Sequence, residues 1–595
     1  MTLQLSSLAV TPLDPEIEAE LDRFENGVAR YLAGEIDDDA FRVFRLNQGI
    51  YGQRQGGNNQ MVRIKVPHGR LEPEQLEMIA HVSEEYSRGW AHFTTRQNVQ
   101  MHFVQLEQAG EVLRLLAAVG LTSREACGDT VRNVAGCHLA GACPYEVLDI
   151  SAWAQATTDW FLRNPLAQRL PRKFKINFSG CATDCGQAMF NDVGVIAVSR
   201  PLPDGTVEPG FRVFVAGGLG ANPHPAQAIE EFTPRDQLLA TIESILRVFN
   251  NHGNRDNKLR ARMKWLVDSM GMDELRTRIM KERRFLVASA TYPAGVPAIV
   301  EERGDAPAGM GTTAPGDAGD FVPVDFLSFD PFTSWERANV VRGRSNGTVS
   351  AYAHSRLGDI TADQLRAMAE IQRDFDLELR VTNRQNLVLR GLRDDQLRDL
   401  HARLAEIEMA TPGAELVRDV VACPGADTCN LAVTQSRGLA SDIGKALEEA
   451  GLAEVPGVRI NISGCTNSCG QHHISDIGFF GLERRAHGKS APGYQMLLGG
   501  RVGDMEIEFG DKATKVPAKR ASEAVVQVVR RFASERDAGE TFATWLDRSG
   551  GAAKVGADLK VLDEFPTPDE GPEFYVDFDE TGPYEAQVGD SECAT

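Results

Sequence analysis

The chain has 595 residues, too many for one hydrophobic core, and at about 150 residues per domain it predicts three or four domains. No apolar run approaches the roughly 20 residues that a helix needs to cross a bilayer, so no membrane span is expected. The net charge of -21 argues against general nucleic-acid binding, which needs a basic surface. The N-terminus lacks a basic region followed by an apolar one, so a cytoplasmic location is expected.

Two similar halves follow one another along the chain. In the first, a helical pattern that begins at 71 leads into an alternating run ending in TTRQN at 94–98. In the second, a helical pattern that begins at 360 leads into VTNRQN at 381–386. Each pattern predicts a helix followed by a strand, with Arg96 or Arg384 displayed to a cleft. The similarity continues in register, because VRNVAGC is repeated as VRDVVAC and NFSGC as NISGC.

This repeat predicts an α+β fold of duplicated modules related by a pseudo-twofold axis. Each half should hold a small α/β half-domain and a larger α/β module, and a segment rich in Gly, Pro and Ala should link the halves. The expected boundaries are 25–115 and 326–400 for the half-domains, 116–290 and 401–550 for the modules, 291–325 for the linker and 551–595 for an acidic tail.

Four cysteines of the second half stand in two short-spaced pairs. Five residues separate the members of the first pair and three separate those of the second. Four thiolates on two loops can bind a 4Fe-4S cluster or a structural zinc ion, and the five-residue gap favours iron and sulfur. Gly464 and Gly470 let the backbone pass close to a bulky group. The alternative is that these are buried small apolar residues. The four are Cys423, Cys429, Cys465 and Cys469.

Several motifs together carry a resemblance to a known family. CPGxxxC followed by SGCxNxCG, with TTRQN, VRN and LPRKFKI upstream and NRDNKLRARMKWLVD at 254–268, resembles the sirohaem and iron-sulfur nitrite/sulfite reductases. The resemblance covers roughly 25–550. It implies two ferredoxin-like half-domains and two larger α/β modules around one buried cofactor.

The resemblance also implies which residues form the catalytic centre. Cys469 would bridge a 4Fe-4S cluster to the sirohaem iron, and the other three second-half cysteines would bind the remaining cluster irons. The substrate-facing cations would be Arg96, Arg132, Lys173 and Lys175. Guanidinium groups can fix an oxyanion, and ammonium groups can supply protons. Further side chains that can bind the carboxylates of the sirohaem are Arg54, Arg63, Arg172, Asn257, Lys258 and Arg260.

The first half repeats the cysteine spacing, with Cys137, Cys143, Cys181 and Cys185. A pseudo-twofold axis predicts a mirror site there, formed with second-half basic residues. Arg384, Arg418 and Arg459 match three of the four cations, but Gly457 stands at the position of Lys173. The mirror set is therefore either a cluster site of structural or electron-storage value, or unoccupied. Cys127 and Cys593 fall outside both cysteine patterns.

The resemblance implies the six-electron reduction of sulfite to sulfide, with reduction of nitrite to ammonia as the alternative. Lys175, the second lysine of RKFK, favours sulfite, whereas RARMKWLVD is similar to nitrite-reducing members. No dinucleotide fingerprint is visible, so we expect a ferredoxin, or alternatively a flavoprotein, to deliver the electrons. A non-catalytic binding protein or a cluster-only electron carrier would leave the four matched cations unexplained.

Overall fold

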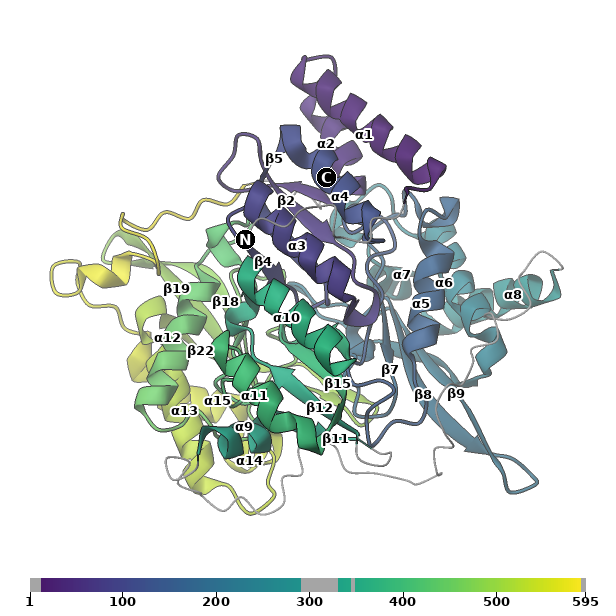
Figure 1. Cartoon of the computed structure of the whole chain (residues 1–595). Helices are drawn as coiled ribbons and strands as arrows, with labels where there is room; N and C mark the ends of the chain where they lie inside the picture. The colour runs from purple at the N-terminus through teal and green to yellow at the C-terminus, as the bar shows by residue number, and fades with distance from the viewer. Residues whose placement is uncertain (1–11, 290–329, 344–347, 590–595) are drawn as a thin grey trace.

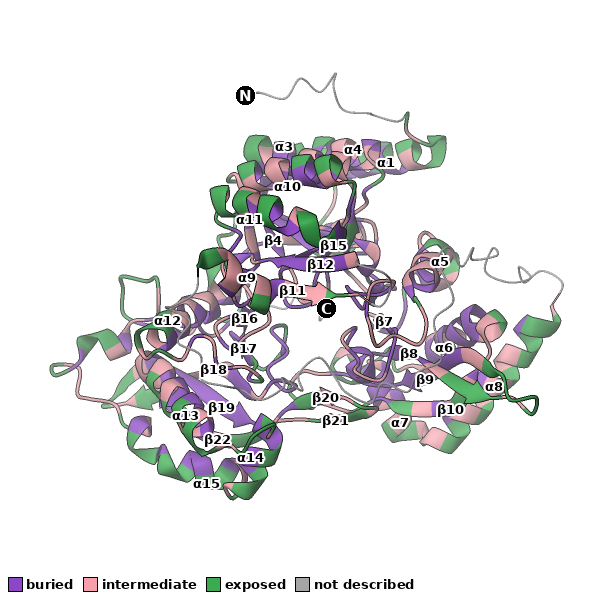
Figure 2. Ribbon diagram, turned by 60° about the horizontal axis from the view of Figure 1, so that its bottom comes forward, coloured by how far each residue is buried: buried purple, intermediate pink, exposed green. Residues whose placement is uncertain are grey.

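The computed structural model describes residues 12–289, 330–343 and 348–589. The expected linker at 291–325 and Cys593 lie outside the described residues. Two small half-domains lie together above two larger modules, which stand on either side below them (Figure 2). Among the helices of the described ranges, none combines the length and the apolar character needed to cross a membrane.

Each half-domain is a five-stranded antiparallel sheet with helices packed against it (Figure 1). The first has, in spatial order, β1 (Ile50–Gly52), β2 (Asn59–Ile64), β5 (Val99–Gln105), β4 (Trp90–Phe93) and β13 (Asp359–Thr361), with helices α1 (Pro15–Leu32), α2 (Asp38–Asn47), α3 (Pro73–Tyr86) and α4 (Ala109–Ala118). The second has β11 (Val340–Arg342), β12 (Thr348–Ala353), β15 (Leu387–Arg393), β14 (Glu378–Val381) and β3 (Arg70–Leu71), with α9 (Pro331–Asn339), α10 (Ala362–Phe375) and α11 (Leu397–Glu406).

The two sheets exchange their edge strands. β13 comes from the second half of the chain yet pairs with β4, and β3 comes from the first half yet pairs with β14. One hydrophobic core runs through both half-domains and includes Leu71 and Ile360 from the exchanged strands. The half-domains therefore bury their apolar surface as one unit.

Each module is a mixed sheet that begins with three parallel strands. The first has β6 (Ala135–Gly136), β7 (Ile176–Ser179), β8 (Val193–Pro201), β9 (Val207–Val215) and β10 (Gln227–Thr233), with α5 (Ser151–Phe161), α6 (Leu238–His252), α7 (Met263–Met270) and α8 (Met272–Ala288). The second has β16 (Val421–Ala422), β17 (Ile460–Ser463), β18 (Ile477–Ala486), β19 (Lys489–Leu498) and β22 (Asp511–Pro517), with α12 (Ser436–Glu449), α13 (Ala521–Glu535), α14 (Phe542–Arg548) and α15 (Gly551–Asp558).

A capping box begins each of the matched helices of the two half-domains. α10 begins with a capping box in which the Thr361 hydroxyl accepts from the backbone of Gln364 while the Gln364 side chain accepts from the Thr361 backbone. α3 begins with the equivalent pair, Glu72 and Gln75. Both boxes satisfy backbone donors that a helix start leaves free, so they fix where each helix begins.

Two glutamines join the half-domains to the modules at the pseudo-twofold axis. Gln97 donates to the carbonyl oxygens of Gly136 and Val381, at 3.0 and 2.9 Å, and accepts from the Gly136 amide. Gln385 donates to Phe93 and Ala422, at 3.0 and 3.1 Å, and accepts from the Ala422 amide. Each side chain thus bonds the first strand of its own module and the sheet of the other half.

Two segments of the second half of the chain make contacts with other parts of the protein. β20 (Arg501–Gly503) and β21 (Glu506–Glu508) form a hairpin that crosses towards the first module, where Val502 and Ile507 pack against a cluster around Met189 and Phe214 (Figure 2). After α15, which packs on β22, the acidic tail wraps over the loop at 428–436: the Tyr584 hydroxyl donates to the Val433 carbonyl at 2.9 Å.

Replacement of Gln385 by alanine should destabilise the whole chain, because it leaves buried carbonyl groups of two elements without donors. We expect the thermal unfolding midpoint of Gln385→Ala to fall by about 5 °C. Gln527→Ala is the matched control, since Gln527 is an exposed residue of α13 that bonds only its neighbour Glu523 among the contacts described. Equal midpoints for the two variants would contradict the central role of Gln385.

Candidate functional site

Two loops of the second module hold its four cysteines. Cys423 is the first residue after β16, and Cys465 is the second residue after β17. Since β16 and β17 are parallel, both loops leave the same edge of the sheet. The side chains of Cys423, Cys429 and Cys465 are half-buried, that of Cys469 is exposed, and none of the four is in a disulfide. The amide of Gly464 donates to the Cys423 sulfur at 3.3 Å.

Burial raises the pKa of three of these thiols, those of Cys423, Cys429 and Cys465. Loss of solvent, followed by repulsion from Cys469, raises the pKa of Cys429 to about 12 and raises the pKa of Cys423 and of Cys465 as well. A metal centre would provide the positive charge that deprotonates them. Within the described part of the chain, no three His, Cys, Asp or Glu side chains are close enough together to share a single ion.

Glycines make room for the loops. A Cβ on Gly470 would overlap the carbonyl oxygen of Ile462, and one on Gly464 would lie 2.7 Å from that of Thr434. Residues without a side chain therefore let the cysteine loop pass close to β17 at Gly470 and close to the loop at 425–434 at Gly464.

The Arg-Gln-Asn turn of the first half lies against Cys469. The Thr95 hydroxyl donates to the Cys469 carbonyl at 2.9 Å, and the Gln471 amide donates to the Thr95 carbonyl at 3.3 Å. Thr95 was not singled out from the sequence, although it stands inside the repeated motif. These contacts put Arg96, the next residue, beside the cysteine loops of the opposite half.

Arg96 is held rigidly by neutral partners. Its guanidinium donates to the side-chain oxygens of Asn177 and Asn191, at 2.9 and 3.0 Å, and to the Asn133 carbonyl at 2.7 Å. Burial, and then repulsion by Arg132, lower the pKa of Arg96 to about 9. Its buried Nε has no hydrogen-bond partner within the described ranges, which leaves a donor for a bound group.

Lys175 lies within electrostatic reach of both sides of the site. Loss of solvent lowers its pKa well below the usual value, and the charges of Arg96, Arg262 and Lys173 lower it further, while Cys469 opposes the shift. Arg262 is a cation that sequence reasoning missed, although it stands in the quoted segment at 254–268. It forms an ion pair with the buried Asp192 at 2.8 Å.

The guanidinium group of Arg132 forms hydrogen bonds with backbone carbonyl groups. Its guanidinium donates to the Gly128 carbonyl at 3.0 and 2.9 Å and to the Ala126 carbonyl at 3.0 Å. It therefore braces the loop around the buried Cys127, against which Tyr51 packs, and it adds to the positive field at Arg96.

The other predicted residues lie in four different places. Arg54 donates to the Ala432 and Cys429 carbonyls, at 3.0 and 3.4 Å, and so supports the cluster loop. Arg63 lies over the ring of Tyr51, 5.0 Å from its centroid. Arg172 and Lys258 pair with Asp129, at 3.5 and 2.6 Å. Asn257 and Arg260 are exposed near η7 (Lys258–Arg260), where the Asn257 side chain accepts from the Leu259 amide and Arg260 lies over Trp265.

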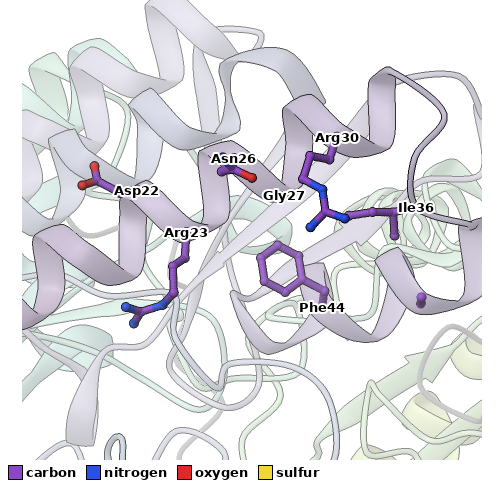
Figure 3. A pocket seen from close by; sticks show the side chains of 8 residues that line it. Asp22, Arg23, Asn26, Gly27, Arg30, Ile36 and Phe44 are labelled. Atoms are coloured by element: carbon purple, nitrogen blue, oxygen red, sulfur yellow. The ribbon is translucent and has the colours of Figure 1, made fainter.

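A separate hollow of about 550 Å³ opens between α1 and α2, where Phe44 and Arg30 face it (Figure 3). Its lining contains none of the cysteines or the basic residues described above. The chemistry therefore points to the cysteine loops and not to this hollow.

The duplicated α+β fold brings the four thiols of the second half close to cations of the first, an arrangement suited to a redox protein with an iron-sulfur site beside an anion site. The chain belongs to the nitrite and sulphite reductase family: the model of the "Nitrite and sulphite reductase 4Fe-4S domain" matches 127–285 and 413–553. The "Nitrite/Sulfite reductase ferredoxin-like half domain" matches 51–119 and 342–407. The expected family, fold class and cofactors, sirohaem and a 4Fe-4S cluster, are thereby confirmed.

Similar proteins include members named for either substrate. The assimilatory ferredoxin-dependent nitrite reductase of Haloferax mediterranei is 29% identical over 90% of this chain and 89% of its own. The sulfite reductase [ferredoxin] of Mycobacterium tuberculosis is 29% identical over 89% of this chain and 92% of its own. The solved structure of the Mycobacterium tuberculosis NirA protein superposes with a TM-score of 0.73 at 29% identity, covering 90% and 97% of the two chains.

Alanine at position 470 should disturb the cysteine loop, because its Cβ would displace β17 or the loop itself. We expect Gly470→Ala to lose most of the iron and acid-labile sulfide of this site. Gly444→Ala is the matched control, since a Cβ there meets nothing within 4 Å and alanine should stabilise α12 by about 0.5–1 kcal/mol. A Gly470→Ala protein with full iron content would show that the loop tolerates a side chain.

Proposed function

We propose that the chain reduces sulfite to sulfide, with six electrons and six protons converting one sulfite into one sulfide and three waters. The observation that carries this proposal is the set of first-half cations that lie near Cys469 of the second module. The alternative is reduction of nitrite to ammonium, which takes six electrons and eight protons and releases two waters.

The residues present fit the expected cofactors. Cys423, Cys429 and Cys465 would hold a cluster and Cys469 would link it to sirohaem, and the free Nε of Arg96 suits an anionic partner. When bound, a sirohaem coupled to a 4Fe-4S cluster supplies an iron for the substrate and a path for single electrons.

The protein's own groups would orient the anion and deliver protons. Arg96 is fixed by Asn177, Asn191 and the Asn133 carbonyl, so its guanidinium can position an oxyanion at little entropic cost. Lys175 has a lowered pKa, which makes its ammonium group a readier proton donor as each oxygen leaves as water.

The charge balance favours sulfite over nitrite. Arg96, Lys173, Lys175 and Arg262 act on one another, and Asp192 is the buried carboxylate that pairs with this group. The remaining positive charge attracts a dianion more strongly than a monoanion. The relatives named for sulfite and for nitrite are equally similar, so charge is the argument that separates the two substrates.

A ferredoxin is the proposed electron donor, because the relatives of both kinds are named as ferredoxin-dependent. A flavoprotein is the alternative. Comparing kcat/KM for sulfite and nitrite with the same reduced ferredoxin tests both proposals. We expect the sulfite value to be higher; a strong preference for nitrite would overturn the choice of substrate, and turnover with a reduced flavoprotein alone would overturn the choice of donor.

Removal of the Lys175 charge should change substrate preference as well as rate. We expect Lys175→Asn to lower kcat/KM for sulfite roughly 100-fold, through loss of one fixed cation, and to lower that for nitrite less. Lys512→Asn, at an exposed position of β22, is the control for removal of a lysine charge. Equal losses for the two anions would mean that Lys175 does not discriminate between them.

A further inference from the structure

The first module repeats the cysteine loops of the second in a buried form. Cys137 follows β6 directly, Cys181 follows β7 by one residue, and β6 and β7 are parallel like β16 and β17. The side chains of Cys137, Cys143 and Cys181 are at most 8% exposed. Thiol contacts join Cys137 to Cys185 and Cys143 to Cys181, so the four sulfurs converge.

A hydrogen bond between a half-domain and a cysteine loop also occurs in both halves of the structure. The Asn383 side-chain amide donates to the Cys185 carbonyl, just as the Thr95 hydroxyl donates to the Cys469 carbonyl. Asn383 and Thr95 hold the same place in the two Arg-Gln-Asn turns. The backbone of the first-half cysteine loops is therefore positioned by the same device as that of the second-half loops.

Two buried arginines lie beside the first-half thiols, and Glu378 and Asp149 are carboxylates that act on Arg390 there. Arg380 and Arg390, 2% and 6% exposed, share the carboxylate of Glu378. Arg380 also donates to the Cys137 carbonyl at 3.4 Å, and Arg390 donates to the Ala140 carbonyl. The buried Nε of Arg390 lacks a hydrogen-bond partner among the residues that the structure describes. A buried guanidinium in this position needs an anion.

Two polar side chains complete the surroundings. The His138 Nε2 and the Tyr352 hydroxyl are 2.8 Å apart, and this hydroxyl lies within electrostatic reach of Cys137, Cys143 and Cys185. The other ring nitrogen of His138 is buried and lacks a partner in the described ranges. Hydrogen-bond donors of this kind around sulfur tune a cluster's potential.

We propose that Cys137, Cys143, Cys181 and Cys185 bind a second 4Fe-4S cluster, one that stands alone without a sirohaem. Four thiolates give such a cluster a net negative charge, which complements Arg380 and Arg390, two buried arginines that share the one carboxylate of Glu378. A single zinc ion is disfavoured by the five-residue gap between Cys137 and Cys143, which is longer than the usual gap in a zinc site. The thiol pairs must separate as the cluster enters.

The charges of the second-half residues explain why we propose no sirohaem at this second site. Arg384, the counterpart of Arg96, pairs with Glu415 at 3.2 Å, and Arg418 pairs with Glu448. Asp419 stands where the first half has Asn133, and Gly457 stands where it has Lys173. These acids neutralise the cations that would bind an anionic macrocycle and its substrate. The second site is therefore expected to carry electrons but not to reduce anions.

Iron and acid-labile sulfide counts on anaerobically purified holoenzyme test the proposal directly. Two clusters and one sirohaem predict about nine irons and eight sulfides per chain, whereas one cluster predicts about five and four. The lower count, normalised to sirohaem absorbance, would overturn the proposal. This outcome does not depend on which anion the second-half centre reduces.

A double variant locates the extra irons. Cys143→Ser with Cys181→Ser should lose about four irons and four sulfides while keeping the sirohaem absorbance. Cys429→Ser with Cys465→Ser is the matched control in the other half and should lose a cluster together with the sirohaem spectrum. An unchanged iron count in the first double variant would show that these cysteines bind no cluster, whether or not the wild-type count is high.

The charge argument has its own test. Arg390→Gln removes a cation beside the proposed cluster and should shift one reduction potential, followed by electron paramagnetic resonance, to a more negative value. Arg393→Gln, on the same strand but exposed, should leave both potentials unchanged. Equal potentials in the two variants would contradict a cluster beside Arg390.

Discussion

The reciprocal hydrogen bonds of Gln97 and Gln385 are the constraint on which the arrangement depends. Each glutamine bonds the first strand of its own module and a carbonyl of the other half's sheet, and both residues have a left-handed backbone, with φ of 58° and 70°. Non-glycine residues adopt this conformation at a cost, and the paired bonds compensate for it. The resulting turns place residues 95 and 96 against the opposite module, and residues 383 and 384 likewise.

Because the scaffold is symmetric, a few side chains decide how the two sites differ. Asn133 and Asp419 occupy matched positions and each accepts from its arginine through the backbone carbonyl, but the side chain of Asp419 adds a negative charge near Arg384. Arg63 and Tyr352 also match, as the pairing of β2 and β12 with equivalent positions of β5 and β15 shows. One site thus combines first-half cations with the more exposed second-half thiols, and the other combines buried first-half thiols with arginines and acids of the second half.

Much of this architecture was predictable from sequence, because the repeat preserves motif order and spacing. The α+β class and the family follow from the cysteine spacing and the Arg-Gln-Asn turns, which are local patterns. The exchange of β3 and β13 was not predictable, since strands of two and three residues carry no periodic signal and pair only in the tertiary structure. The directions of the side chains at 254–268 were not predictable either, because they depend on the tertiary structure. Asn257 and Arg260 are exposed, whereas Arg262 lies near the other cations of the site.

The two cysteine loops are held by different groups, and this explains where the positive charge lies. In the second half, the irregular loop obtains partners from Arg54 and from the tail: Gly589 donates to Asn430, and the Gln435 amide donates to Asp577. Irregular backbone needs such partners because its polar groups have no regular ladder. In the first half, the carbonyls of Cys137 and Ala140 are bonded by Arg380 and Arg390 from β14 and β15. Guanidinium groups are charged, so the two arginines that bond this buried loop also place positive charge beside the first-half thiols.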